Sequence, residues 1–272
     1  MRSTACFAAL VRVQCLVVST PNLLLPGWCL PDTTVSVLFP VVHFDVVATA
    51  QGSCLLQVGG TKVICAVFGP REGGRSDGFS ATVGRLRCDV KVATFAKKHC
   101  RGTFGNGAEE KDLSQWLAQA LSPATLAHTF PKAVVDVYAM VLDAHGNELA
   151  AVAMAGSCAL CHAGIAQRDL VLAATVACVP SDADPLGVLI LDPSPEEVRA
   201  ATGIATVASM PCCDRITASR VTGHWVNDGA SEALDACLDA CRGLDALLRD
   251  ALKRETAKVV GPTHQRAAAG ST

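Results

Sequence analysis

Residues 50–70, AQGSCLLQVGGTKVICAVFGP, constrain the fold of this chain more than any other segment. Two short apolar runs, 54–58 and 62–67, flank the sequence Gly59-Gly60-Thr61. Apolar runs rich in β-branched residues on either side of a glycine turn are typical of a β-hairpin. The segment therefore predicts an antiparallel hairpin that turns at the glycines and stops at Gly69-Pro70.

Downstream of the hairpin, hydrophobic periodicity predicts both strands and helices. The run RLRCDVKV alternates charged and apolar residues, which is typical of a strand buried on one face. Apolar residues recur at helical spacing over 109–127, over 150–163 and after Ser231, which we expect to cap the last helix. Further strands are predicted at 133–142, 169–179, 187–191, 204–210 and 215–225. This order favours an α+β fold of mixed β-sheets packed with α-helices.

Composition narrows the class of protein. A chain of 272 residues with 50% hydrophobic and 18% charged residues can bury a substantial core. The formal net charge of −2 excludes a broadly basic nucleic-acid binder, so any RNA contact requires a local patch. One tyrosine and three tryptophans leave few platforms on which bases could stack.

Fourteen cysteines need a separate explanation. Most lie in apolar runs, which favours buried thiols in a reducing compartment over a disulfide framework. Cys158, Cys161 and His162 match a haem-attachment pattern in letters only, because they lie in a run of small residues typical of a packed helix. Cys212-Cys213 and the pair Cys237 and Cys241 lack a partner pair at zinc-finger spacing. We therefore expect no cofactor and no metal.

Residues 1–43 do not show the strand and helix periodicity of the rest of the chain. Arg12 and Gln14 interrupt an apolar run that is too broken to span a membrane, and four prolines follow it by residue 40. We expect residues 1–43 to be an atypical, poorly ordered or misannotated segment. Residues 44–257 are expected to form one domain, and 258–272 a flexible tail. No membrane partner is expected.

Several motifs resemble those of one family. The hairpin resembles the opening hairpin of RNase PH-like proteins, the phosphorolytic 3′-exoribonucleases and their relatives in the exosome ring. GRLRCDV at 84–90, the helix at 109–121, the AGSCALCHAGIAQRDLV block at 155–171 and Ser209-Met210-Pro211 follow in the order of the family. The resemblance covers roughly residues 44–253, and it is closest to the mRNA transport regulator three, or exosome component six, family of ring subunits.

The resemblance implies that this member has no catalytic residues. Active relatives bind phosphate through an arginine after a Gly-Gly-Thr turn, whereas Leu149 stands in that position here and Glu148 would repel phosphate. Active relatives also place a carboxylate before the strand that leads to the Met-Pro motif, where this chain has Gly203 or Ile204. Neither residue can transfer a proton.

Three carboxylates, Asp192, Glu196 and Glu197, remain near this position. Without a site for phosphate, we expect them to form the solvated face of a loop. The alternative function is an active phosphate-dependent 3′-exoribonuclease. A third possibility, an organellar tRNA-trimming enzyme, requires an Arg-rich leader that residues 1–40 do not supply.

Candidate RNA-binding residues lie in one basic loop and on the strand before it. The family resemblance implies that Lys97, Lys98 and Arg101 face RNA, and Arg85 and Arg87 would extend the patch. The alternative is an ordinary solvated loop. The implied partners are other RNase PH-like exosome ring subunits, cap subunits with RNA-binding folds and single-stranded RNA. The implied role is scaffolding in rRNA maturation and mRNA turnover, in the nucleus, nucleolus and cytoplasm.

Overall fold

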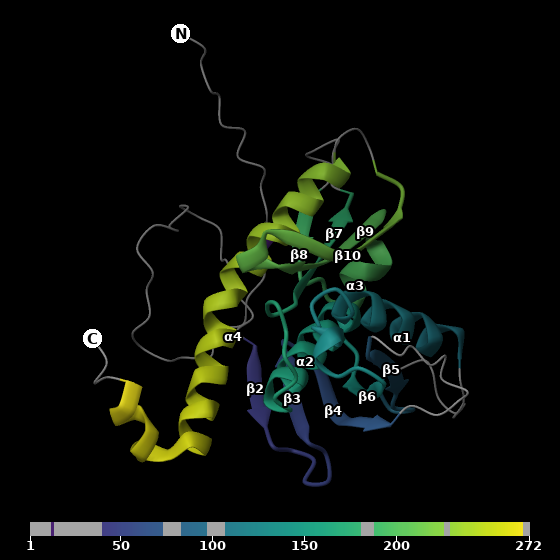
Figure 1. Ribbon diagram of the computed structural model, residues 1–272. Helices are drawn as coiled ribbons and strands as arrows, with labels where there is room; N and C mark the ends of the chain where they lie inside the picture. Colours follow the sequence, from purple (N-terminus) through teal and green to yellow (C-terminus); the bar gives the residue numbers. More distant parts are fainter. Residues whose placement is uncertain are drawn as a thin grey trace.

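The computed structural model describes residues 12–13, 40–72, 83–96, 107–180, 188–225 and 229–268, with the side chains of the last helix described to residue 258. Within these residues the chain forms two five-stranded sheets, with strand orders β2-β3-β4-β6-β5 and β1-β8-β7-β9-β10. Helix α2 contacts strands of both sheets and lies near the centre of the molecule (Figure 1). This mixed architecture confirms the predicted α+β fold.

The elements have the following bounds. The strands of the first sheet are β2 (Val41–Phe44), β3 (Gly52–Val58), β4 (Thr61–Glu72), β5 (Arg85–Val92) and β6 (Ala133–Asp143). Those of the second are β1 (Arg12–Val13), β7 (Leu172–Val179), β8 (Val188–Leu191), β9 (Gly203–Met210) and β10 (Arg215–Gly223). The helices are α1 (Ala108–Leu121), α2 (Glu148–His162), α3 (Pro195–Ala200) and α4 (Gly229–Ala268), with 3₁₀ turns at Ala127–Thr129 and Pro211–Cys213.

The predicted hairpin is confirmed as β3 and β4. The two strands pair antiparallel, with Val58 opposite Thr61 and the two glycines between them. The predicted end at Gly69-Pro70 is wrong, because β4 continues to Glu72 past an irregularity between Phe68 and Arg71. A register shift absorbs the two residues that lack a partner, so the strand bends without ending.

Strand β5 has the predicted bounds and pairs in parallel with β6 at the edge of the first sheet. Side chains of helix α1 bond the backbone N–H groups on the outer edge of β5. The backbone N–H of Val90 donates to Ser114 Oγ at 2.9 Å, and that of Val92 donates to Glu110 Oε1 at 3.3 Å. Because these N–H groups are bonded, this part of the edge cannot add another strand in register.

Helix α2 is buried along most of its length because its residues are small. Its run from Ala150 to Leu160 is buried throughout. A Cβ atom on Gly156 would lie 2.9 Å from Leu121 Cδ1 of α1, so the glycine permits close packing of the two helices. The predicted helix at 150–163 is thus confirmed, with Cys158 inside the core.

Helix α4 covers β7 and β9 of the second sheet and then passes β2 (Figure 1). Cys237, Cys241 and Leu248 are buried on its inner face. The prediction that Ser231 caps this helix is wrong, because α4 already begins at Gly229. The helix extends to Ala268 and so enters the segment 258–272 that was assigned to a tail.

Helix α3 was missed by the sequence analysis. It is one short helix with a capping box, in which Ser194 and Glu197 bond each other's backbone N–H groups and Pro195 occupies the first turn. Glu196 and Glu197 therefore belong to a helix start and not to a loop face. The signal was present as the sequence Ser-Pro-Glu-Glu.

The ten cysteines within the described residues are free, and six of them are buried. Burial raises the pKa of Cys88 and of Cys161 to about 12, so these thiols remain protonated and act as small apolar side chains. Within the described ranges, no helix is long and apolar enough to cross a membrane.

Candidate functional site

The turn between β6 and α2 occupies the position where the family resemblance places phosphate. Asn147 directly precedes the helix and is buried. Its side-chain Nδ2 donates a hydrogen bond to Oδ1 of Asp192, which follows β8. A Cβ atom on Gly146 would lie 2.7 Å from the carbonyl oxygen of Pro193. The start of α2 is therefore hydrogen-bonded to, and closely packed against, the turn that leads into α3.

Asp192 is held in this junction by its backbone and its side chain. Its φ of 51° lies in the left-handed region, and its backbone N–H donates to the carbonyl oxygen of Thr175 at 2.9 Å. Burial raises the pKa of its carboxyl group from 3.8 to about 7. The expectation of a solvated carboxylate at Asp192 is thus wrong, because its carboxyl group is desolvated and bonded to Asn147.

The raised pKa of Asp192 predicts a specific pH dependence of stability. The folded chain holds a proton that the unfolded chain loses near pH 4, so this group costs stability progressively as the pH rises from about 4 to about 7. We expect Asp192→Asn to gain stability relative to the wild type across this window and to keep a constant advantage above it. Urea unfolding at a series of pH values measures the difference. A difference that does not change with pH would contradict a buried carboxyl group.

The first turn of α2 offers no cation to phosphate. Leu149 is half-buried and packs against the hydrophobic core, while its carbonyl oxygen accepts a hydrogen bond from Trp116 Nε1 at 3.2 Å. Glu148 lies beside it in the first helical turn. A carboxylate at a helix start interacts favourably with the helix dipole, which would otherwise attract an anion. The negative charge of Glu148 thus stabilises the start of the helix and disfavours binding of a phosphate there.

The family resemblance places its proton-donating carboxylate at Gly203 or Ile204, at the start of β9. Strand β9 begins at Gly203, where a Cβ atom would lie 2.6 Å from Trp225 Cε2. The tryptophan ring thus covers the glycine. Ile204 lies between Ala177 of β7 and Thr222 of β10. Neither Gly203 nor Ile204 carries a group that exchanges protons.

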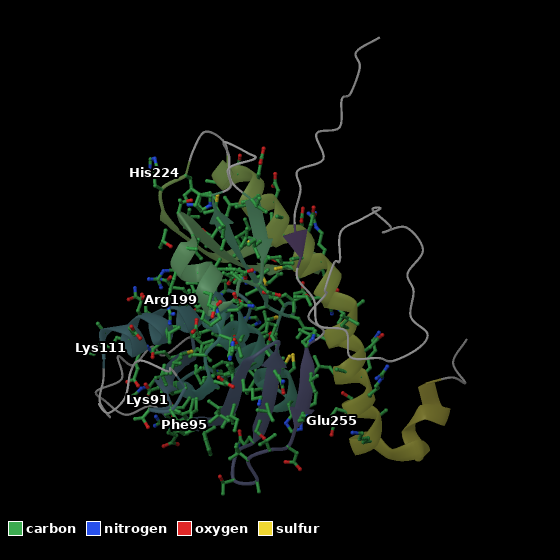
Figure 2. All side chains as sticks on the ribbon, turned by 180° about the vertical axis from the view of Figure 1, so that it is seen from behind. Lys91, Phe95, Lys111, Arg199, His224 and Glu255 are labelled. Carbon is green, nitrogen blue, oxygen red and sulfur yellow. The ribbon has the colours of Figure 1, made fainter. Side chains whose placement is uncertain are left out.

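The predicted RNA-binding residues are only partly described. Lys97, Lys98 and Arg101 lie outside the described residues. Arg85 and Arg87 lie on the exposed face of β5, as the alternation predicted. Lys91 on the same strand is bonded to Glu110 of α1 at 3.3 Å. Figure 2 shows Lys91 on the same side of the molecule as Phe95, whose side chain precedes the basic loop and is 74% exposed.

The structure adds Arg71 to these arginines. Arg71 of β4 and Arg85 of β5 are both paired with Val134 of β6, one on each side. Arg71 Nε donates to Oδ2 of the buried Asp136. We call Arg71, Arg85 and Arg87 the arginine face. The available signal was the aspartate within the apolar strand AVVDVYAMVLD, because a buried carboxylate needs a cation.

Comparisons with known proteins identify the family of this chain. The RNase_PH family model, described as "3' exoribonuclease family, domain 1", matches residues 41–166. The Arabidopsis thaliana protein "Exosome complex component RRP41-like" is 38% identical over 208 residues, which cover 76% of this chain and 77% of the relative. Human "Exosome complex component MTR3" is 37% identical over 218 residues, which cover 75% and 78%. The chain therefore belongs to the RNase PH family.

Solved structures support the same fold. Rrp46 from rice (Oryza sativa) matches with a TM-score of 0.68 at 22% identity, over 79% of this chain and 95% of that one. A chain of the Archaeoglobus fulgidus exosome, with RNA bound to the active site, matches with a TM-score of 0.62 at 21% identity, over 78% and 87%. The family motifs identified in the sequence thus belong to a domain with the RNase PH fold.

Proposed function

We propose that this protein is a non-catalytic RNase PH-like subunit of the eukaryotic exosome ring. The membership of the family and the names of the relatives, exosome complex components from a plant and from humans, support a role in such a complex. The observation that carries the non-catalytic assignment is the start of α2, where Leu149 is half-buried against the core at the position that the family resemblance gives to the phosphate-binding arginine.

Two further features of the site support this assignment. Asn147 and Asp192 bond to each other at the helix start, so a polar group of the chain itself occupies this junction. Gly203 and Ile204 supply no proton donor to a leaving ribose oxygen. Phosphorolysis requires both a bound phosphate and a proton, and the described site favours neither.

The proposed role is structural, with RNA as a ligand. The chain would associate with other RNase PH-like subunits in a ring, receive cap subunits with RNA-binding folds, and contact single-stranded RNA through Lys97, Lys98 and Arg101. It would thereby support rRNA maturation and mRNA turnover in the nucleus, nucleolus and cytoplasm. The runner-up remains an active phosphate-dependent 3′-exoribonuclease, favoured by the description of the family model.

The variant Leu149→Arg tests how far the site has diverged. We expect it to remain inactive in RNA phosphorolysis with inorganic phosphate, because one arginine does not restore a proton donor at Ile204. Nucleoside diphosphate release is measured by chromatography. Activity gained by this single change would show that the rest of the catalytic site is intact and would contradict the proposal.

A further inference from the structure

The arginine face lies on the side of the first sheet that α2 does not cover. On β6, Val135, Val137 and Ala139 point inward and are buried, whereas Tyr138 on the opposite side is 44% exposed. Paired residues on neighbouring strands share a face, so Arg87 and Phe68 lie on either side of Asp136 on this outer side. The sheet therefore brings residues from three strands to one flat surface.

The arginines outnumber the acidic side chains on this surface, where Asp136 is buried and Asp89 of β5, which is paired with Tyr138, is half-buried. Asp136 is 3% exposed and bonded to Arg71, which offsets its negative charge. Arg87 is exposed and has no ion-pair partner among the residues that the structure describes. Adjacent strands are about 4.8 Å apart, which places the backbones of Arg71 and Arg85 roughly 10 Å from one another. A polyanion could contact several of these arginines at once.

An aromatic side chain lies beside the arginines. Tyr138 follows Asp136 by two residues on β6 and therefore points to the same face. Its ring packs edge-on against Phe68, with centroids 5.9 Å apart and an interplanar angle of 68°. This contact restrains the only tyrosine of the chain in a half-exposed position. A restrained ring loses little conformational entropy when a base stacks on it.

We propose that the arginine face and Tyr138 together bind single-stranded RNA, with the arginines paired to phosphates and the tyrosine stacked on a base. This inference rests on the proposed function, which brings RNA to the chain. It assigns a second RNA-contact surface besides the basic loop. Sheets that carry exposed aromatic residues are an established way to bind unpaired bases, and arginines supply the charge for the backbone. Neither contact selects a base sequence.

The alternative is that the same surface binds a protein partner. Met140, which is 44% exposed, extends it by one more apolar side chain. Arginine, tyrosine and methionine are all enriched at protein interfaces, but the cores of those interfaces are depleted in charge. Arg87 is exposed here and has no ion-pair partner among the residues that the structure describes, which suits a polyanion better. The positive charge and the single ring favour RNA. A protein partner is one outcome of the test.

The test measures binding of the full-length chain to a fluorescent oligouridylate of about ten nucleotides at several salt concentrations. We expect Arg85→Gln with Arg87→Gln to lower the affinity about tenfold and to reduce the slope of log affinity against log salt by about 1.4. Tyr138→Ser should lower the affinity about tenfold without changing the slope, and Tyr138→Phe should retain binding. Arg71 is left intact because it holds the buried Asp136.

The control is Arg242→Gln with Arg254→Gln, which removes the same charge from exposed positions on α4. All variants must show the thermal unfolding of the wild type. Losses confined to the arginine face and Tyr138 would support the proposal. Unchanged RNA binding, no measurable binding by the wild type, or lost association with a ring subunit at unchanged RNA affinity would overturn it. A phosphorolysis assay on the same samples reports separately on the proposed function.

Discussion

Replacing Arg249 with methionine is expected to destabilise the folded chain by about 3 kcal/mol. Arg249 Nη2 of α4 donates to Asp169 Oδ1, and the Asp169 side chain is only 2% exposed. Asp169 also accepts hydrogen bonds from the backbone N–H groups of Leu170 at 2.9 Å and Cys212 at 2.8 Å. Without the guanidinium, a buried carboxylate that ties α4 to the start of β7 loses its cation.

Asp245→Asn is the matched control for this variant. Asp245 is the second carboxylate partner of Arg249, one helical turn away, with an Nε to Oδ1 distance of 2.8 Å. It lies on the same helix, so its loss should cost only about 0.5 kcal/mol. Urea unfolding at constant pH measures both variants. Equal effects would mean that the contact between Arg249 and Asp169 contributes no more than an ordinary pair within a helix.

Gly52→Ala is expected to destabilise the chain by about 3 kcal/mol, although it adds one carbon atom. A Cβ atom at this position would lie 2.3 Å from Ala163 N and 2.6 Å from Ala159 O. Both are backbone atoms at the end of α2, so no side-chain rotation can relieve the contact. Either β3 or α2 must move, and both belong to the core.

Gly243→Ala is the matched control, in which the same substitution is expected to raise stability. Nothing lies within 4 Å of a Cβ atom at Gly243, which is inside α4. Alanine is favoured over glycine in a helix by about 1 kcal/mol, so this variant should be more stable than the wild type. Thermal unfolding measures both substitutions. A Gly52→Ala protein as stable as the wild type would show that α2 does not pack this closely on β3.

Local signals explain which elements the sequence predicted. The glycine turn located the β3–β4 hairpin, and strict alternation located β5 with its bounds. Strand β2 was missed because four residues are too few to show a period. The continuation of β4 past Gly69-Pro70 depends on β6, which supplies partners beyond the irregularity. Such tertiary pairing overrides a local breaker signal.

The candidate site rests on single positions in the sequence. Leu149 and Ile204 were assigned from motif order alone. The structure shows Leu149 packed against the core and Ile204 within β9, and the loss of catalysis stays a prediction. The bond between Asn147 and Asp192 joins residues 45 apart in sequence, and Arg71 and Asp136 are 65 apart. No periodicity signals such contacts. They form because the first sheet and the β8 turn bring polar groups together during folding.

The central claim is that this RNase PH-fold chain does not catalyse phosphorolysis. The most direct test incubates the purified wild-type chain with single-stranded RNA and inorganic phosphate and measures the release of nucleoside diphosphates by chromatography. An active RNase PH-family enzyme assayed in parallel confirms that the conditions support the reaction. We predict no phosphate-dependent release above that of a protein-free control. Sustained release of nucleoside diphosphates that requires phosphate would contradict this account and establish the chain as an exoribonuclease.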